Sequence, residues 1–284
     1  MKGIASTDIV KVQGQQQSQM VDFVVAEEPL EIRLGFLKNG VRQQKSISVT
    51  MRTPGHDEEL ALGFLFTEGI IGGAEQVTGF SRPPVRWKQA KENVLVVEMA
   101  DDVVVDLGRL ERNFYISSSC GVCGKASIEA VRVQGQFELS EPVPMFPAGV
   151  LHSLPELLAT RQSIFDCTGG LHGAALFDRA GKLLLAREDV GRHNALDKLI
   201  GAAMRQGILP LFEHLVLVSG RAGFELVQKS VLAGVAVLAA VGAPSSLAVE
   251  LAEEAGMTLV GFLRNEQFNI YTCPARVVFE ILDG

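Results

Sequence analysis

Short apolar runs alternate with helical patterns across the C-terminal half of the chain, and this alternation limits the possible folds more than any other feature. Helical periodicity covers residues 148–161, 191–206, about 223 onward and 245–255. Strand-like runs cover residues 171–177, 182–186, 215–219, 235–241, 258–262 and 269–272. Because strands that alternate with helices usually bury both faces of their sheet, the pattern predicts a mixed, largely parallel sheet with helices on both faces.

The N-terminal half contains mainly strand signals and predicts a smaller, β-rich domain. Strands are expected at 28–34, 46–51, 94–99 and 103–107, and a helix is expected to start within 53–59. The turn signal Asn39-Gly40 lies between the first two strands and predicts a hairpin. Together, the patterns of the two halves predict an α/β (α+β) fold for the whole chain.

Composition changes along the chain suggest three segments. Residues 1–20 are polar and rich in glutamine, so they are expected to be disordered. Residues 21–141 form the β-rich domain. Pro142, Pro144 and Pro147 interrupt regular structure and place a boundary before the second domain, residues 148–284.

The overall charge and the absence of targeting signals restrict the function classes. A net charge of −7 over 284 residues argues against non-specific binding to nucleic acid or to an anionic membrane. The most apolar window, residues 230–251, is interrupted by glycine and proline and is interpreted as a buried strand and helix. The N-terminus lacks a secretory h-region, so the four cysteines are expected to work in the reducing cytoplasm.

The predicted element order of the second domain is also that of a cytidine-deaminase-like fold. In zinc deaminases a His-x-Glu lies on the helix after the paired strands, and Pro-Cys-x-x-Cys begins the next helix. The corresponding segments here are 188–195 and 219–223, which retain His193 and have no cysteine. Because a zinc site needs three or four ligands, we expect the architecture without zinc or any other metal.

Two cysteines, Cys120 and Cys123, form a Cys-x-x-Cys motif in a segment rich in glycine and serine. Three chemistries use this spacing: a metal site, a dithiol/disulfide couple and a sulfur-carrying thiolate. A zinc site would need further ligands, for which Cys167, His172 or His193 are available. The residues alone leave the three chemistries open, together with a structural role as small apolar side chains.

Four other segments have the composition of ligand loops. Glycines surround His172 in 168–175, and Ser219-Gly220-Arg221 closes a strand before a helix. Arg192 and His193 lie near a helix N-terminus, where the helix dipole disfavours cations and a bound anion would explain them. The fourth segment, 262–269, follows a strand. Tight turns, a capped helix start and a surface hairpin are the structural alternatives for these segments.

Together these segments resemble the FdhD proteins, the formate dehydrogenase accessory sulfurtransferases. The resemblance extends from about residue 27 to about residue 272. The segments that carry it are Ser-Cys-Gly-Val-Cys-Gly-Lys (119–125), Thr-Gly-Gly-Leu-His-Gly-Ala-Ala (168–175), Arg-Glu-Asp-Val-Gly-Arg-His-Asn-Ala-Leu-Asp-Lys (187–198), Ser-Gly-Arg-Ala-Gly-Phe-Glu (219–225), 55–71 and 261–272.

The resemblance implies a zinc-free deaminase-like fold and a sulfur carrier. It implies that the protein accepts sulfur from a cysteine desulfurase and passes it to the molybdenum of a bis-molybdopterin guanine dinucleotide cofactor for formate dehydrogenase. By position, Cys120 matches the persulfide-bearing cysteine and Cys123 its motif partner. A homodimer is expected for this fold class. The alternative function is a cofactor-binding chaperone that carries no sulfur.

The resemblance also assigns a cofactor-binding segment. Its residues are Phe262, Leu263, Arg264, Asn265, Glu266 and Gln267, of which Asn265, Glu266 and Gln267 differ from the residues of other members. The phosphates and guanines of such a cofactor would also suit the loops that contain His172, Arg192, His193, Ser219, Gly220 and Arg221.

Overall fold

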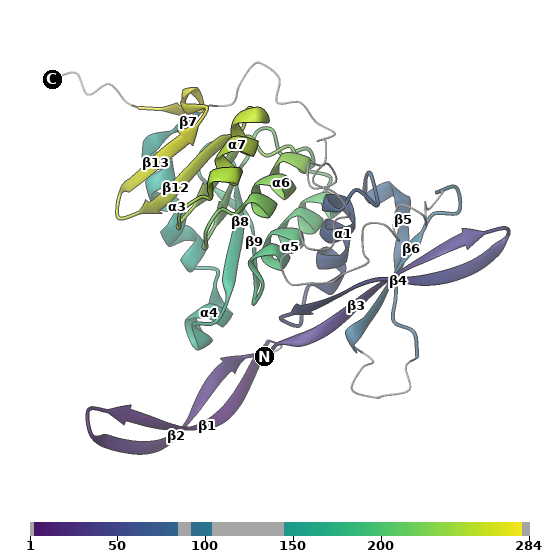
Figure 1. Cartoon of the computed structure of the whole chain (residues 1–284), viewed down its shortest axis with the longest axis horizontal. Coiled ribbons are helices and arrows are strands. Elements are labelled where there is room, and N and C mark those ends of the chain that lie inside the picture. The colour runs from purple at the N-terminus through teal and green to yellow at the C-terminus, as the bar shows by residue number, and fades with distance from the viewer. Residues whose placement is uncertain (1–2, 85–91, 104–144, 280–284) are drawn as a thin grey trace.

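The computed structural model describes residues 3–84, 92–103 and 145–279 (Figure 1). The Cys120/Cys123 motif, most of the strand expected at 103–107 and the predicted domain boundary before Met145 lie outside the described residues.

A six-stranded mixed sheet forms the centre of the C-terminal half. Its strands are β8 (His172–Phe177), β9 (Leu183–Asp189), β10 (Leu215–Val218), β11 (Val237–Ala240), β12 (Thr258–Arg264) and β13 (Gln267–Thr272). They lie in the order β13-β12-β11-β10-β8-β9. Only β10–β11 and β11–β12 are parallel pairs among these strands, so the prediction of a largely parallel sheet is wrong. Short turns join β8 to β9 and β12 to β13, and a turn that short can connect only antiparallel strands.

Helices cover both faces of this sheet, as predicted. The helices are α3 (Ala148–Ala159), α4 (Ser163–Thr168), α5 (Arg192–Arg205), α6 (Phe224–Leu232) and α7 (Ser246–Glu254). Alternate residues of each strand enter different cores: Ala174 and Leu176 pack with α5 and α6, whereas Ala175 and Phe177 pack with α3. The predicted order of helices and strands is therefore confirmed, with α4 as an additional short helix.

A four-stranded sheet and helix α1 make up most of the described part of the N-terminal half after residue 27. The elements are β3 (Glu28–Lys38), β4 (Val41–Arg52), α1 (Asp57–Thr67), a 3-10 turn η1 (Ala74–Gln76), β5 (Val77–Ser81) and β6 (Val94–Met99), and the strand order is β4-β3-β6-β5. Asn39 and Gly40 both have positive φ, which the predicted tight hairpin turn requires. Near the C-terminus, η4 (Pro274–Arg276) leads into β14 (Val277–Val278), which pairs with β7 (Phe146–Pro147).

Residues 4–25 form a hairpin, so the expectation that residues 1–20 are disordered is wrong for this segment. Strand β1 (Ile4–Gln13) pairs along its whole length with β2 (Gln16–Val25), and Gly14 with a φ of 62° makes the turn. The glutamine content suggested disorder, but β-branched residues alternate with the polar ones and favour a strand. The hairpin projects away from the rest of the molecule (Figure 1).

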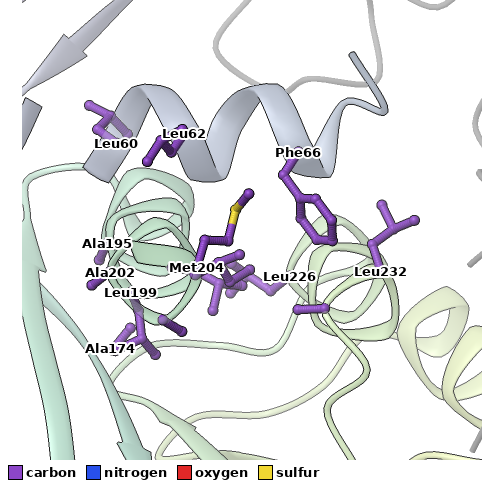
Figure 2. Close-up of a cluster of buried hydrophobic side chains, with 14 of the residues drawn as sticks. Leu60, Leu62, Phe66, Ala174, Ala195, Leu199, Ala202, Met204, Leu226 and Leu232 are labelled. Atoms are coloured by element: carbon purple, nitrogen blue, oxygen red, sulfur yellow. The ribbon is translucent and has the colours of Figure 1, made fainter. Parts of the chain in front are cut away.

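The two halves share one hydrophobic core. Helix α1 lies across α5 and α6, and its Leu62 and Phe66 point toward Met204, Leu226 and Leu232 (Figure 2). The helices α1 and α5 touch backbone to backbone at two glycines. A Cβ added to Gly63 would lie 1.9 Å from the Asp197 carbonyl oxygen, and one added to Gly201 would lie 1.9 Å from that of Glu59.

A buried ion pair links the same helices. Lys229 Nζ of α6 donates to both carboxylate oxygens of Asp197 on α5, at 2.9 and 3.0 Å, and to Thr67 Oγ1 of α1 at 2.8 Å. Burial alone would lower the pKa of Lys229, but the Asp197 carboxylate raises it, so the amine stays charged. The orientation of α1 against α5 and α6 is therefore fixed by polar as well as apolar contacts.

Candidate functional site

The loops singled out from the sequence meet along one edge of the six-stranded sheet. Strands β9, β10, β11 and β12 all end at this edge, and β8 begins there because it runs antiparallel to β10. His172 at the start of β8 pairs with Asp189 at the end of β9. We call this region the ligand edge. The carboxyl ends of strands in open α/β sheets are where ligands usually bind.

Backbone hydrogen bonds join the loops of the ligand edge to one another. Ser219 after β10 donates its N–H to the Gly173 carbonyl at 2.9 Å, and its hydroxyl accepts from the Gly173 N–H at 2.8 Å. Gly242 after β11 donates to the Gly220 carbonyl at 3.0 Å and accepts from the Phe262 N–H at 3.1 Å. Four strands therefore hold their terminal loops in fixed positions relative to one another.

Gly220 lets the His172 ring lie close to the loop after β10. A Cβ at Gly220 would be 3.3 Å from His172 Nδ1, tighter than most such contacts. Burial lowers the pKa of His172 below its usual value of 6.5; the positive charges of Arg192 and His193 lower it further, and Asp189 raises it. Arg192 and His193 begin α5, three and four residues after Asp189, which pairs with His172 across the two strands. At neutral pH His172 is uncharged and offers one donor and one acceptor nitrogen.

Arg192→Gln is expected to raise the pKa of His172 toward 6.5, because the substitution removes a repulsive charge. A titration of the histidine ring signals by NMR measures the change. Arg205→Gln, at the far end of the same helix, is the matched control and should leave the pKa unchanged.

The same pKa shift has a consequence for stability. His172 takes up its proton at a lower pH in the folded chain than in the unfolded chain, so its contribution to stability is complete above pH 6.5. That contribution is lost as the pH falls from 6.5 through the folded pKa. If the pKa of His172 were the same in wild type and in Arg192→Gln, Arg192 would not lie close enough to His172 to affect its charge.

Asp189 fixes the start of α5 at the ligand edge. It is fully buried, its Oδ2 lies 2.6 Å from Lys198 Nζ, and its Oδ1 accepts from the Gly191 N–H at 2.9 Å. The Asn194 side chain also donates to Oδ1 at 3.0 Å. The N-terminus of α5, whose first N–H groups have no partner within the helix, is thereby held beside His172, where it suits an anionic ligand.

Glu225 is a residue of the ligand edge that the sequence did not single out. It lies in the first turn of α6, and its Oε2 is 2.8 Å from His193 Nε2. Its other oxygen, Oε1, is buried and has no hydrogen-bond partner among the described residues. A buried acceptor without a partner is costly, so a ligand donor at this point would be favourable. In the sequence, Glu225 could have been noticed because it follows Gly223-Phe224 at the start of a predicted helix.

Residues 262–267, which the resemblance assigns to cofactor binding, lie in different surroundings. Phe262 has a φ of 55° and meets the ligand edge through Gly242, whereas the Leu263 side chain is fully buried in the core on the α3 face. Arg264 is exposed at the end of β12. Asn265 and Glu266, both with positive φ, form the exposed turn into β13, and Gln267 begins that strand.

A shallow groove of about 670 Å³ lies beside this turn. Its lining includes His152 of α3 and Glu266, Gln267 and Phe268 of the hairpin. The predicted segment therefore reaches two places, the ligand edge at Phe262 and this groove at Glu266 and Gln267.

Within residues 3–84, 92–103 and 145–279, no group of three or more His, Cys, Asp or Glu side chains is arranged to hold a metal ion. Cys167 and Cys273 in these ranges are free thiols, in α4 and after β13 respectively. No helix of the described ranges is both long and apolar enough to cross a membrane.

Known proteins share both the sequence and the fold of this chain. The sulfur carrier protein FdhD of Streptomyces avermitilis is 49% identical over 273 residues, which is 95% of this chain and 94% of that protein. The protein of the same name from Mycolicibacterium paratuberculosis is 52% identical over 258 residues, 89% of this chain and 91% of that one. That of Saccharolobus solfataricus is 39% identical over 271 residues, 95% of this chain and 96% of that one.

A solved structure and a family profile also match this chain over most of its length. The crystal structure of a proposed formate dehydrogenase accessory protein from Desulfotalea psychrophila matches with a TM-score of 0.73 and 24% identity, over 97% of this chain and 99% of that one. This likeness supports the fold. The profile of the FdhD/NarQ family matches residues 25–278, which include every element of the ligand edge. The chain therefore belongs to the FdhD/NarQ family.

Proposed function

We propose that this protein is a sulfur carrier that accepts sulfur on Cys120 from a cysteine desulfurase and delivers it to the molybdenum of bis-molybdopterin guanine dinucleotide, for use by formate dehydrogenase. The observation that carries the proposal is family membership over residues 25–278, since the relatives are named sulfur carrier proteins. In this scheme the molybdenum cofactor is the substrate that receives the sulfur.

The ligand edge suits an anionic dinucleotide. Arg192 and Arg221 are cationic, and His193 offers a further polar side chain. The helix N-termini of α5 and α6 supply N–H groups for phosphate oxygens. The unpartnered Oε1 of Glu225 is an acceptor, and guanine presents N–H donors on its Watson–Crick edge. Both the charges and the unpartnered acceptor therefore fit a guanine nucleotide.

The first transfer step needs only one thiolate from this chain. The Cys120 thiolate attacks the outer sulfur of the desulfurase persulfide, and an S–S bond forms at Cys120 as the bond to the desulfurase cysteine breaks. The desulfurase leaves as a thiolate, so the step is a simple exchange without net oxidation. The residues next to Cys120 in the sequence are mostly glycine and serine, which have small side chains.

The nucleotide part of the proposal can be tested with GDP, which contains the guanine and a pyrophosphate. Arg221→Ala is expected to weaken GDP binding about tenfold or more, because a hydrogen bond to a charged group contributes about 1.5–3 kcal/mol. Isothermal titration calorimetry measures the affinity. Arg179→Ala is the matched control, since Arg179 is exposed in the β8–β9 turn at the opposite edge of the sheet.

Equal affinities for the Arg221 and Arg179 variants would exclude the ligand edge as the nucleotide site. A carrier of cofactor without sulfur, the chaperone function, would also bind GDP there. Alanine variants of Cys120 and Cys123 separate the two functions, because only the sulfur carrier needs these thiols.

A further inference from the structure

Tyr271 of β13 is an aromatic residue that stays partly exposed, at 37%, beside the ligand edge. Its ring lies against the backbone of Gly261 in β12, next to Pro244. A Cβ added to Gly261 would be 3.0 Å from Tyr271 Cε2 and 2.9 Å from Pro244 Cδ. Pro244 directly precedes Ser245, the N-cap of α7. The ring is therefore held close to the start of α7 while part of it remains open to solvent.

Two glycines connect this ring to Arg221 of the ligand edge. The Cβ position of Gly261 is also 3.3 Å from the Gly242 carbonyl oxygen, and a Cβ on Gly242 would lie 3.1 Å from Arg221 Cγ. Arg221 is itself exposed. Because neither glycine has a side chain, the stem of Arg221 and the ring of Tyr271 both reach the same short stretch of backbone.

We propose that Tyr271 is the stacking platform for the base of the bound guanine nucleotide and that Arg221 contacts its phosphates, an inference that rests on the proposed function because that function supplies the nucleotide. A nucleotide joins a flat π-system to a charged group through one sugar. Tyr271 and Arg221 offer an aromatic ring and a guanidinium at neighbouring positions. Stacking of bases on aromatic side chains, with arginine on the phosphates, is a common way to bind nucleotides.

Stacking gives Tyr271 a role in affinity and not in the choice of base. Every base has a π-face, so an aromatic ring accepts guanine and adenine alike, whereas hydrogen-bonding groups distinguish them. The contact needs the ring of Tyr271 but not its hydroxyl. Phenylalanine can therefore replace Tyr271 in this role, and alanine cannot.

Tyr271→Ala is expected to weaken GDP binding about tenfold or more, which is the size of effect that loss of a stacking aromatic has. Binding of inorganic pyrophosphate, which has phosphate charges but no base, should stay within about twofold of wild type. Arg221→Ala should weaken the binding of both ligands. Isothermal titration calorimetry of the full chain measures these affinities.

Tyr271→Phe and Phe23→Ala are the matched controls. The first keeps an aromatic ring at the same position. The second removes a 52% exposed ring from the β1–β2 hairpin, which projects away from the ligand edge (Figure 1). Both controls should bind GDP as wild type does. A loss of affinity in Tyr271→Phe as large as in Tyr271→Ala would assign the effect to the hydroxyl and overturn the stacking role.

The other outcomes separate this inference from the proposed function. Equal GDP affinities of Tyr271→Ala and wild type, with weaker binding by Arg221→Ala, would overturn the stacking role and leave the nucleotide site in place. Equal losses of GDP and pyrophosphate binding in Tyr271→Ala would show that the ring only supports the loops, which also overturns stacking. A wild-type protein that binds neither ligand would overturn the nucleotide site itself.

Discussion

Replacing Cys120 by alanine is expected to reduce the activity of the client formate dehydrogenase to the level of cells that lack this protein. The thiolate is the group that takes sulfur from the desulfurase, and alanine has no atom that can do so. GDP binding by Cys120→Ala should stay within about twofold of wild type, because the substitution leaves every described residue of the ligand edge unchanged. The measurements are complementation of a deletion strain and calorimetry of the purified variant.

Cys167→Ala and Cys273→Ala are the matched controls, since both are free thiols in the described part of the chain. Each should support wild-type formate dehydrogenase activity. Full activity of the Cys120→Ala/Cys123→Ala double variant would contradict sulfur carriage and favour the chaperone function. Loss of activity in the Cys167 variant alone would indicate that the wrong thiol has been assigned.

Gly201→Ala is expected to destabilise the fold by about 3 kcal/mol or more, although alanine is the better helix former. The new Cβ would lie 1.9 Å from the Glu59 carbonyl oxygen, and a backbone atom cannot move aside as a flexible side chain can. Helices α1 and α5 would have to separate, which would open the core that they share. Urea denaturation gives the free energy of unfolding.

Gly149→Ala is the control for this substitution. Gly149 also lies in a helix, α3, but outside its own helix no atom of the described residues is within 4 Å of the Cβ that alanine would add. This variant should be as stable as wild type or slightly more stable. A Gly201→Ala protein with wild-type stability would show that α1 and α5 do not pack as closely as described.

Local patterns predicted most elements, and the errors have physical causes. Alternation and turn residues identified the hairpin at Asn39-Gly40 and the order of helices and strands after Ala148. The prediction of mostly parallel strand pairs was wrong because apolar runs do not show whether a short turn or a helix connects one strand to the next. Residues 4–20 were missed because a polar, glutamine-rich composition is also compatible with a paired β-ribbon.

The candidate site was only partly predictable. His172, Arg192 and Arg221 are close in sequence to glycines and helix starts, so their loops could be recognised as ligand loops. That these loops meet at one edge depends on the antiparallel pairing of β8 with β10, which the sequence did not predict. The unpartnered oxygen of Glu225 and the contact between Gly201 and Glu59 depend on residues far apart in the chain. Only the packed fold brings these groups together: the helix start at Gly223 could have drawn attention to Glu225, but not to its unpartnered oxygen.

Peptide mapping by mass spectrometry after incubation with a cysteine desulfurase and cysteine tests the central claim most directly. Samples would be prepared with and without reductant, and a catalytically inactive desulfurase would serve as control. The proposed function predicts that the peptide with Cys120 and Cys123 gains the mass of one sulfur atom, that reductant removes it, and that fragmentation places it on Cys120. No gain on that peptide, with an active desulfurase, would contradict the sulfur-carrier function and leave cofactor delivery as the role of the ligand edge.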